Sequence, residues 1–127
     1  MLQTILVFTG GGLGAAARHG VNILAARLLG SDFPYGTAIV NVVGSLVMGL
    51  LAAWFAFRSD AGISQHARLF LTTGVLGGFT TFSTFSLDAV LLWERDAYFL
   101  FGLYIAGSVV ISILALFAGF ALVRSLT

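Results

Sequence analysis

Long apolar runs separated by short polar connections dominate the chain. Charged residues are absent from four stretches, residues 1–17, 33–57, 69–87 and 97–123. A helix needs about 20 mainly apolar residues to cross about 30 Å of hydrocarbon. We therefore predict an all-α membrane protein in which residues 1–127 form a single four-span domain. The predicted spans are Leu2–Leu29, Tyr35–Phe57, Leu69–Trp93 and Tyr98–Val123.

Composition supports the membrane assignment and excludes several classes of function. Hydrophobic residues make up 59% of the chain and charged residues 9%, whereas soluble domains average about 45 to 50% and about 25%. We expect a multi-pass protein of the cell (inner) membrane. A net charge of +1 gives no basic surface for nucleic acid. The absence of Cys and the presence of only two His give no recognisable metal-binding motif, and we do not expect an enzyme.

Two features of these spans are costly inside a membrane. Arg18 lies within the first span, so we expect it either to face a polar interior or to reach toward the span end as a vestibule residue. In the third span, Gly74, Gly77 and Gly78 are followed by Thr80 and Thr81. This pattern weakens one helix and offers a cap for the next. It predicts a helix broken at the midplane, although glycines also permit close helix packing.

Polar residues four apart mark one face on each of two spans. Thr37, Asn41 and Ser45 lie on the second span, and Tyr104, Ser108 and Ser112 lie on the fourth. Hydroxyl and amide donors can replace the water around a small anion without a fixed charge. The alternative is that these small polar residues only pack helices together.

An aromatic row follows the glycines of the third span. Phe79, Phe82 and Phe85 are three residues apart. Phenyl rings carry a positive edge that can face an anion. From the residues alone, plain packing remains the more usual role for such a row.

The run from Gly77 to Ser86, GGFTTFSTFS, closely resembles the GGxTTFSTF signature of the Fluc (CrcB) family of fluoride channels. Two further segments agree with that family in the same order. They are GGLGAAAR at 11–18 and the segment from Gly36 to Gly49, which contains Thr37, Asn41, Gly44 and Ser45. The resemblance covers essentially the whole chain.

The resemblance implies an antiparallel, dual-topology homodimer with two fluoride pores and a structural Na⁺ at the dimer interface. The residues it assigns to the fluoride pore are Asn41, Phe82, Phe85, Ser108, Ser112, Tyr104 and Thr37. Arg18 matches the family's first-span Arg and is expected in a vestibule, and the carbonyls of Gly77 and Thr80 are expected to bind Na⁺. The family often has Glu where this chain has Asp88, so the resemblance leaves the role of Asp88 open.

Two other functions fit a four-span chain of this length. A small multidrug-type cation transporter needs a membrane-buried acid, and the predicted first span contains Arg18 but no Asp or Glu. A membrane assembly subunit that transports nothing is compatible with the same polar faces. Fluoride selectivity over chloride comes only from the family resemblance.

Dual topology also follows from the balance of basic residues. In the four-span order, Arg58, Arg68 and Arg124 lie on the side of the termini. Arg27 and Arg95 lie on the other side, and Arg18 adds a third there if its side chain reaches that way. Short loops allow this balance to set orientation. With no clear excess on either side, we expect the chain to insert in both directions.

Overall fold

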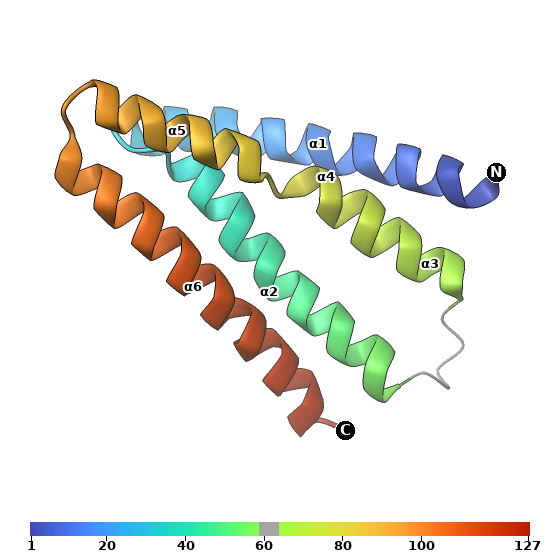
Figure 1. The fold of residues 1–127 in the computed structure, drawn as a ribbon. Helices are drawn as coiled ribbons and strands as arrows, with labels where there is room; N and C mark the ends of the chain where they lie inside the picture. Colours follow the sequence, from blue (N-terminus) through green and yellow to red (C-terminus); the bar gives the residue numbers. More distant parts are fainter. Residues whose placement is uncertain (59–63) are drawn as a thin grey trace.

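The computed structural model describes residues 1–58 and 64–127, and helices account for nearly all of this part of the chain (Figure 1). Two helices precede residues 59–63. They are α1 (Leu2–Leu29) and α2 (Tyr35–Phe57). The remaining segments are α3 (Gln65–Leu69), the π-helical η1 (Phe70–Leu76), α4 (Gly77–Phe79), α5 (Phe82–Glu94) and α6 (Tyr98–Ser125).

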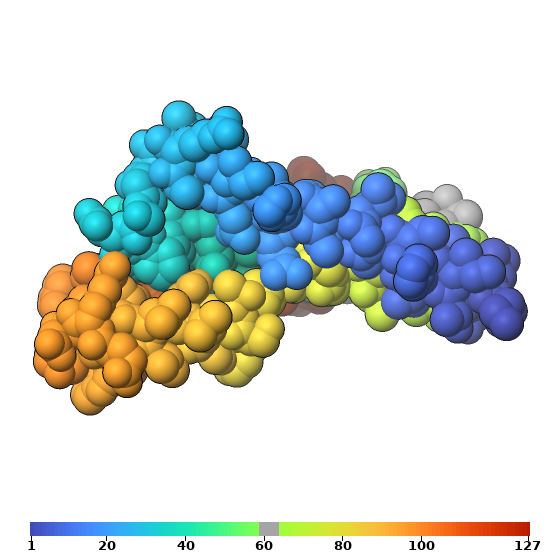
Figure 2. Space-filling model, turned by 90° about the horizontal axis from the view of Figure 1, so that it is seen from above, coloured from blue at the N-terminus to red at the C-terminus, as the bar shows by residue number. Residues whose placement is uncertain are grey.

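The long helices run up and down beside one another. One end of the molecule contains both chain termini, the C-terminal end of α2 and the start of α3 (Figure 1). The α1–α2 and α5–α6 connections lie at the opposite end. Viewed from above, α1 runs along the near face beside the third segment, and α6 lies largely behind the other helices (Figure 2). At the end with the two short connections, the Arg95 side chain donates a hydrogen bond to the backbone oxygen of Asp32.

Three of the described segments are long and apolar enough to cross a membrane. They are Tyr35–Phe57, Gln65–Glu94 taken through its internal interruption, and Tyr98–Ser125. The predicted first span is a helix with the expected bounds, Leu2–Leu29, but it does not reach the same apolarity. Its glycines and the pair Arg18 and His19 lower its mean hydropathy. Whether α1 spans the bilayer therefore stays a prediction.

Helix ends coincide with residues that suit them. α1 ends at Gly30, whose φ of 86° is left-handed and is readily adopted by glycine. Pro34 precedes α2 at a position where its missing N–H costs nothing. The Ser64 side chain accepts a hydrogen bond from the Ala67 N–H at the start of α3. These local preferences explain why the sequence predicted most helix bounds closely.

The third segment departs from regular α-helix twice. Between Phe70 and Leu76 it widens into a π-helix, a form often found at functional sites. At Thr80 and Thr81 the backbone is extended, with ψ of 160° and 124°. The Thr81 side chain then accepts a hydrogen bond from the Thr84 N–H at 3.2 Å and caps α5. The helical hydrogen bonding is thus interrupted between α4 and α5.

Close helix contacts depend on glycine. A Cβ at Gly14 of α1 would collide with the backbone oxygen of Val75, and one at Gly119 of α6 would collide with that of Leu46. α1 and the third segment, and α2 and α6, can therefore pack with their backbones nearly touching. The buried hydrophobic cluster is small: Phe85, Ala89, Leu92 and Tyr104. Large apolar side chains are exposed along α6, as on a surface that meets lipid or another chain.

Candidate functional site

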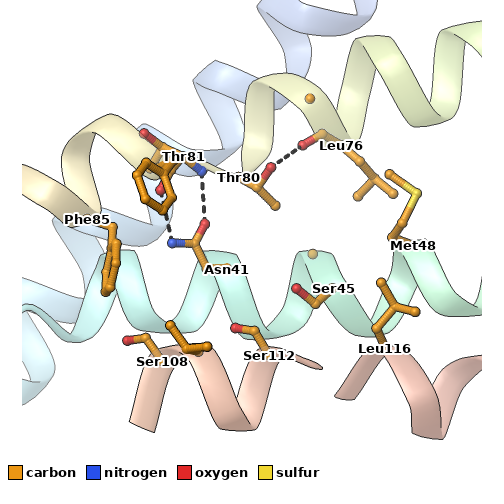
Figure 3. A pocket seen from close by; sticks show the side chains of 14 residues that line it. Asn41, Ser45, Met48, Leu76, Thr80, Thr81, Phe85, Ser108, Ser112 and Leu116 are labelled. Atoms are coloured by element: carbon orange, nitrogen blue, oxygen red, sulfur yellow. Dashed lines mark hydrogen bonds between the residues drawn. The ribbon is translucent and has the colours of Figure 1, made fainter. Parts of the chain in front are cut away.

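A cavity of about 350 Å³ lies where α2, α6 and the interruption of the third segment meet. Its lining includes seven of the predicted site residues, namely Asn41, Gly77, Thr80, Phe82, Phe85, Ser108 and Ser112. Figure 3 shows Asn41 and Ser45 on α2 facing the interruption, with Ser108 and Ser112 along the opposite wall on α6. The cavity therefore combines hydroxyls, an amide and phenyl rings. None of its lining residues is Asp or Glu.

The side-chain amide of Asn41 forms hydrogen bonds to the interrupted backbone through both its nitrogen and its oxygen. Its Nδ2 donates to the backbone oxygen of Thr81 at 3.0 Å, and its Oδ1 accepts from the Thr81 N–H at 2.8 Å (Figure 3). Of these two groups, the Thr81 N–H is the one that a continuous helix would have paired with the Gly77 carbonyl. An amide nitrogen carries two hydrogens, so one remains for an anion in the cavity. Asn41 both holds the interruption in place and offers a donor.

The two predicted phenyl rings differ in their surroundings. Phe85 is 9% exposed and its ring centroid lies 5.0 Å from that of Tyr104. Phe82 is 78% exposed, with its centroid 5.7 Å from that of Phe85 at an interplanar angle of 55°. The Phe85 ring is held by packing, whereas the Phe82 ring stands at the open side of the cavity.

The α6 wall supplies hydroxyl groups. Ser112 has a buried Oγ for which the described part of the chain provides no hydrogen-bond partner. A buried hydroxyl without a partner is unfavourable unless something in the cavity accepts its proton. Ser108 lies one helical turn away, and both serines line the same wall of the cavity.

The predicted cation ligands are compatible with the backbone at the interruption. Within residues 1–58 and 64–127, no backbone donor reaches the carbonyl oxygens of Gly77 or Thr80. The Thr81 N–H, which would pair with Gly77 in a continuous helix, bonds Asn41 instead. Oxygen atoms are the ligands that hard cations prefer. These two carbonyls therefore fit a Na⁺ ion, although a single chain offers too few ligands for a complete site.

Arg18 lies beside the same backbone segment. Its Nε donates to the backbone oxygen of Gly78 at 3.1 Å, which satisfies one more carbonyl near the interruption. Arg18 does not line the central cavity. This predicted vestibule residue therefore contacts the backbone next to the interruption and does not line the central cavity.

Two predicted pore residues lie outside the central cavity. Thr37 lines a second cavity of about 320 Å³, which also contains Thr84, Asp88 and Arg95. The Tyr104 hydroxyl donates to Asp88 Oδ2 at 3.1 Å, while its ring packs against Phe85. Tyr104 thus contacts Phe85, which lines the central cavity, and Asp88, which lines the second cavity.

Sequence patterns missed part of the site. Thr81 was expected only as a helix cap, but its backbone N–H and C=O are also the partners of Asn41. Apolar wall residues Met48, Leu76 and Leu116 were not singled out. Met48 was detectable, because it extends the α2 face of Asn41 and Ser45 by one further turn. Nothing in the sequence distinguishes Leu116 from its apolar neighbours.

Comparisons with known proteins show which family this chain resembles. The family model described as CrcB-like protein, Camphor Resistance (CrcB), matches residues 5–120. The chain is 60% identical over 123 residues to the fluoride-specific ion channel FluC of Rhodopseudomonas palustris strain BisB5, covering 97% of this chain and 98% of that protein. It is 58% identical over 126 residues to FluC 2 of Nitrobacter hamburgensis, covering 99% and 100%. The FluC of Agrobacterium fabrum is 54% identical over 126 residues, covering 99% of each.

Proposed function

Because this chain belongs to the CrcB family, we propose that it is a fluoride-specific ion channel that lets fluoride leave the cytoplasm passively. The chain and its relatives match over nearly their full lengths. Those relatives are named as ion channels and not as enzymes. Their name supplies the choice of fluoride, and the cavity supplies a physical basis for anion passage.

The observation that carries the proposal is the chemistry of the central cavity. Its polar lining consists of Asn41, Ser45, Thr80, Thr81, Ser108 and Ser112, and it includes no carboxylate. Neutral donors can solvate an anion in a low-dielectric environment without trapping it. A proton-coupled cation transporter requires a buried acid at its binding site, and this cavity provides none. The cavity favours an anion pathway over the cation transporter and gives the assembly-subunit alternative no support.

Passive conduction is sufficient for fluoride resistance. Hydrogen fluoride is a weak acid that crosses membranes as a neutral molecule and dissociates in the less acidic cytoplasm. The inside-negative potential then drives the anion outward through any selective leak. No nucleotide or coupled proton is needed.

Growth of a bacterium that lacks its own fluoride exporter tests the proposal in cells. Expression of this chain in the inner membrane is expected to restore growth in fluoride-containing medium. A chain carrying Asn41→Leu serves as the loss-of-function comparison. Equal growth with the chain and with an empty vector, despite membrane insertion, would argue against fluoride export.

The assembled channel is proposed to be an antiparallel homodimer of four-span chains with two pores. Large exposed apolar side chains on α6 and the exposed Phe82 leave surface for lipid and for a second copy. Arg58, Arg68 and Arg124 lie toward one end of the chain, and Arg27 and Arg95 toward the other. This nearly even balance gives the insertion machinery little basis for choosing one orientation.

Labelling a single cysteine tests the dual topology. Gln65, exposed at the start of α3, is a suitable position, and the chain has no native Cys to interfere. For Gln65→Cys we expect comparable labelling by a membrane-impermeant thiol reagent from either side of the membrane. Labelling from one side only would contradict the antiparallel dimer. Tyr98→Cys at the opposite end serves as the matched position.

A structural Na⁺ is proposed at the dimer interface, bound by the carbonyls of Gly77 and Thr80 from both chains. In support, these oxygens have no backbone donor in the described part of the chain, and unpaired carbonyls are costly inside a membrane. Replacing sodium by a large organic cation on both sides is expected to destabilise the dimer and to lower fluoride flux. Anomalous scattering from a heavier monovalent cation should locate the ion. Full flux and dimer stability without sodium, and no ion at these carbonyls, would refute the proposal.

A further inference from the structure

A third cavity, an open groove, lies between α2 and the first half of the third segment and has a volume of about 450 Å³. Its walls are formed by Met48, Ala52, Phe55 and Ala56 from α2 and by Arg68, Thr72 and Thr73 from the facing segment. The groove thus combines one guanidinium and two hydroxyl side chains with an apolar α2 wall. In the sequence, Arg68 stands out only as one of the basic residues that set the charge balance.

This groove and the central cavity share a wall. Met48 lines both, and Figure 3 shows it at one end of the central cavity opposite Leu76. On α2, Asn41, Ser45, Met48, Ala52 and Ala56 are three or four residues apart and therefore follow one helical face. On the facing segment, Leu76 and Thr80 line the central cavity, whereas Arg68 and Thr72 line the groove. The groove therefore adjoins the central cavity at Met48, along the α2 face.

Arg68 is held at the groove while its charge remains accessible. Its guanidinium carbon lies 5.0 Å from the centroid of the Phe55 ring, and Phe55 is only 8% exposed. A buried ring fixes the position of the cation stacked on it. Arg68 itself is exposed, so its positive charge can act on ions in the surrounding water. Thr72 donates its hydroxyl to the Arg68 backbone oxygen at 2.8 Å, which leaves oxygen lone pairs for water.

We propose that this groove is an entry vestibule for small anions and that Arg68 concentrates them there before they pass Met48 into the central cavity. The proposal rests on the proposed function and adds a further positively charged residue to the pathway. Charge in a cleft with low-dielectric walls raises the local concentration of counter-ions and the rate at which they enter. Arg18 does not provide that charge at the cavity, because it donates to the Gly78 carbonyl and lies outside the cavity lining.

Fluoride efflux from liposomes containing the full chain tests this role. Arg68→Gln is expected to lower the initial rate about fivefold at low ionic strength, which is the Boltzmann factor for a unit charge acting on an anion a few ångströms away in water. The deficit should shrink when an impermeant isethionate salt shortens the screening range from about 30 Å at 0.01 M to about 3 Å at 1 M. Arg68→Lys keeps the charge and is expected to retain most of the rate.

Arg58→Gln is the matched control. Arg58 is also exposed, lies at the same end of the molecule and stacks on an aromatic ring, with 4.9 Å between its guanidinium carbon and the Trp54 centroid. It does not line the groove, so its loss should leave the rate nearly unchanged.

Equal effects of the two substitutions, or a deficit in Arg68→Gln that salt does not reduce, would overturn the vestibule. If the unaltered chain conducts no fluoride, the proposed function fails along with it. If that chain conducts and Arg68→Gln conducts equally well, only the vestibule fails.

A cysteine in the groove gives a readout that does not depend on the rate of conduction. Ala52→Cys is expected to react faster with an anionic methanethiosulfonate than with a cationic one, and Arg68→Gln should abolish that preference. Absence of reaction with either reagent would overturn an aqueous vestibule. A flux effect of Arg68→Gln that requires anionic lipid in the vesicles would also overturn it, because Arg68 would then bind a lipid headgroup.

Discussion

Replacing Phe82 or Phe85 with Ile is expected to reduce fluoride flux about tenfold or more while the protein still folds and assembles. Isoleucine retains apolar bulk but lacks the positive ring edge that can face an anion. Loss of an interaction worth about 1.4 kcal/mol, near the upper range for aromatic edge contacts, corresponds to a tenfold change. Flux from liposomes, measured with a fluoride electrode, gives the comparison.

The two rings allow packing and ion contact to be separated. Phe85 packs against Tyr104 and is 9% exposed, so its substitution also costs some stability. Phe82 is 78% exposed, and in a single chain its substitution disturbs little. Phe99→Ile on α6 is the matched control for Phe82→Ile, because Phe99 is 79% exposed and does not line the cavity. If Phe82→Ile conducts like Phe99→Ile, the aromatic ion-contact role of Phe82 is wrong.

Replacing Asn41 with Leu is expected to have the second large effect, on both stability and flux. The substitution leaves the N–H and C=O of Thr81 without their side-chain partners. The Thr81 C=O still accepts the first hydrogen bond of α5, but the Thr81 N–H is left unpaired. A partly buried group left unpaired costs about 1 to 3 kcal/mol, so unfolding in detergent should become easier by about that amount. Flux is expected to be lost because the cavity also loses its amide donor.

Two further substitutions separate the roles of Asn41. Asn41→Asp can still accept from the Thr81 N–H but cannot donate to the Thr81 carbonyl when ionised, and it adds a negative charge to an anion path. We expect it to abolish flux with a smaller loss of stability than Asn41→Leu. Ser45→Ala is the control for stability alone, since Ser45 lies one turn away on the same α2 face but is not a hydrogen-bond partner of Thr81. Unchanged stability in Asn41→Leu would show that its bonds to Thr81 do not hold the interruption.

Helix positions could be predicted from the sequence because they depend on local information. The bounds Leu2–Leu29 and Tyr35–Phe57 agree with the structure, since charged residues, Gly30 and Pro34 mark the ends. The third segment starts earlier than predicted, at Gln65. Ser64 caps it there through a side-chain hydrogen bond, and a search for apolar residues alone does not detect a cap. The π-helix at Phe70–Leu76 has no periodic signal of its own.

Only part of the candidate site could be predicted from the sequence. Helical spacing placed Asn41 and Ser45 on one face and Ser108 and Ser112 on another, and the structure brings both pairs to one cavity. The same spacing included Thr37 and Tyr104, which lie beyond Phe85 and outside that cavity. Spacing along a helix assigns a face but not the point where a facing helix is interrupted. The contact between Arg18 and the Gly78 carbonyl likewise joins residues far apart in the chain.

Fluoride release from liposomes that contain this chain as their only protein measures the proposed channel activity directly. With a potassium gradient and valinomycin setting an inside-negative potential, we predict rapid fluoride efflux and far slower efflux when chloride replaces fluoride. Liposomes without protein and liposomes with Asn41→Leu are expected to retain their fluoride. Retention of fluoride by liposomes containing the folded, unaltered chain, or equal release of chloride and fluoride, would contradict the assignment of a fluoride-specific channel.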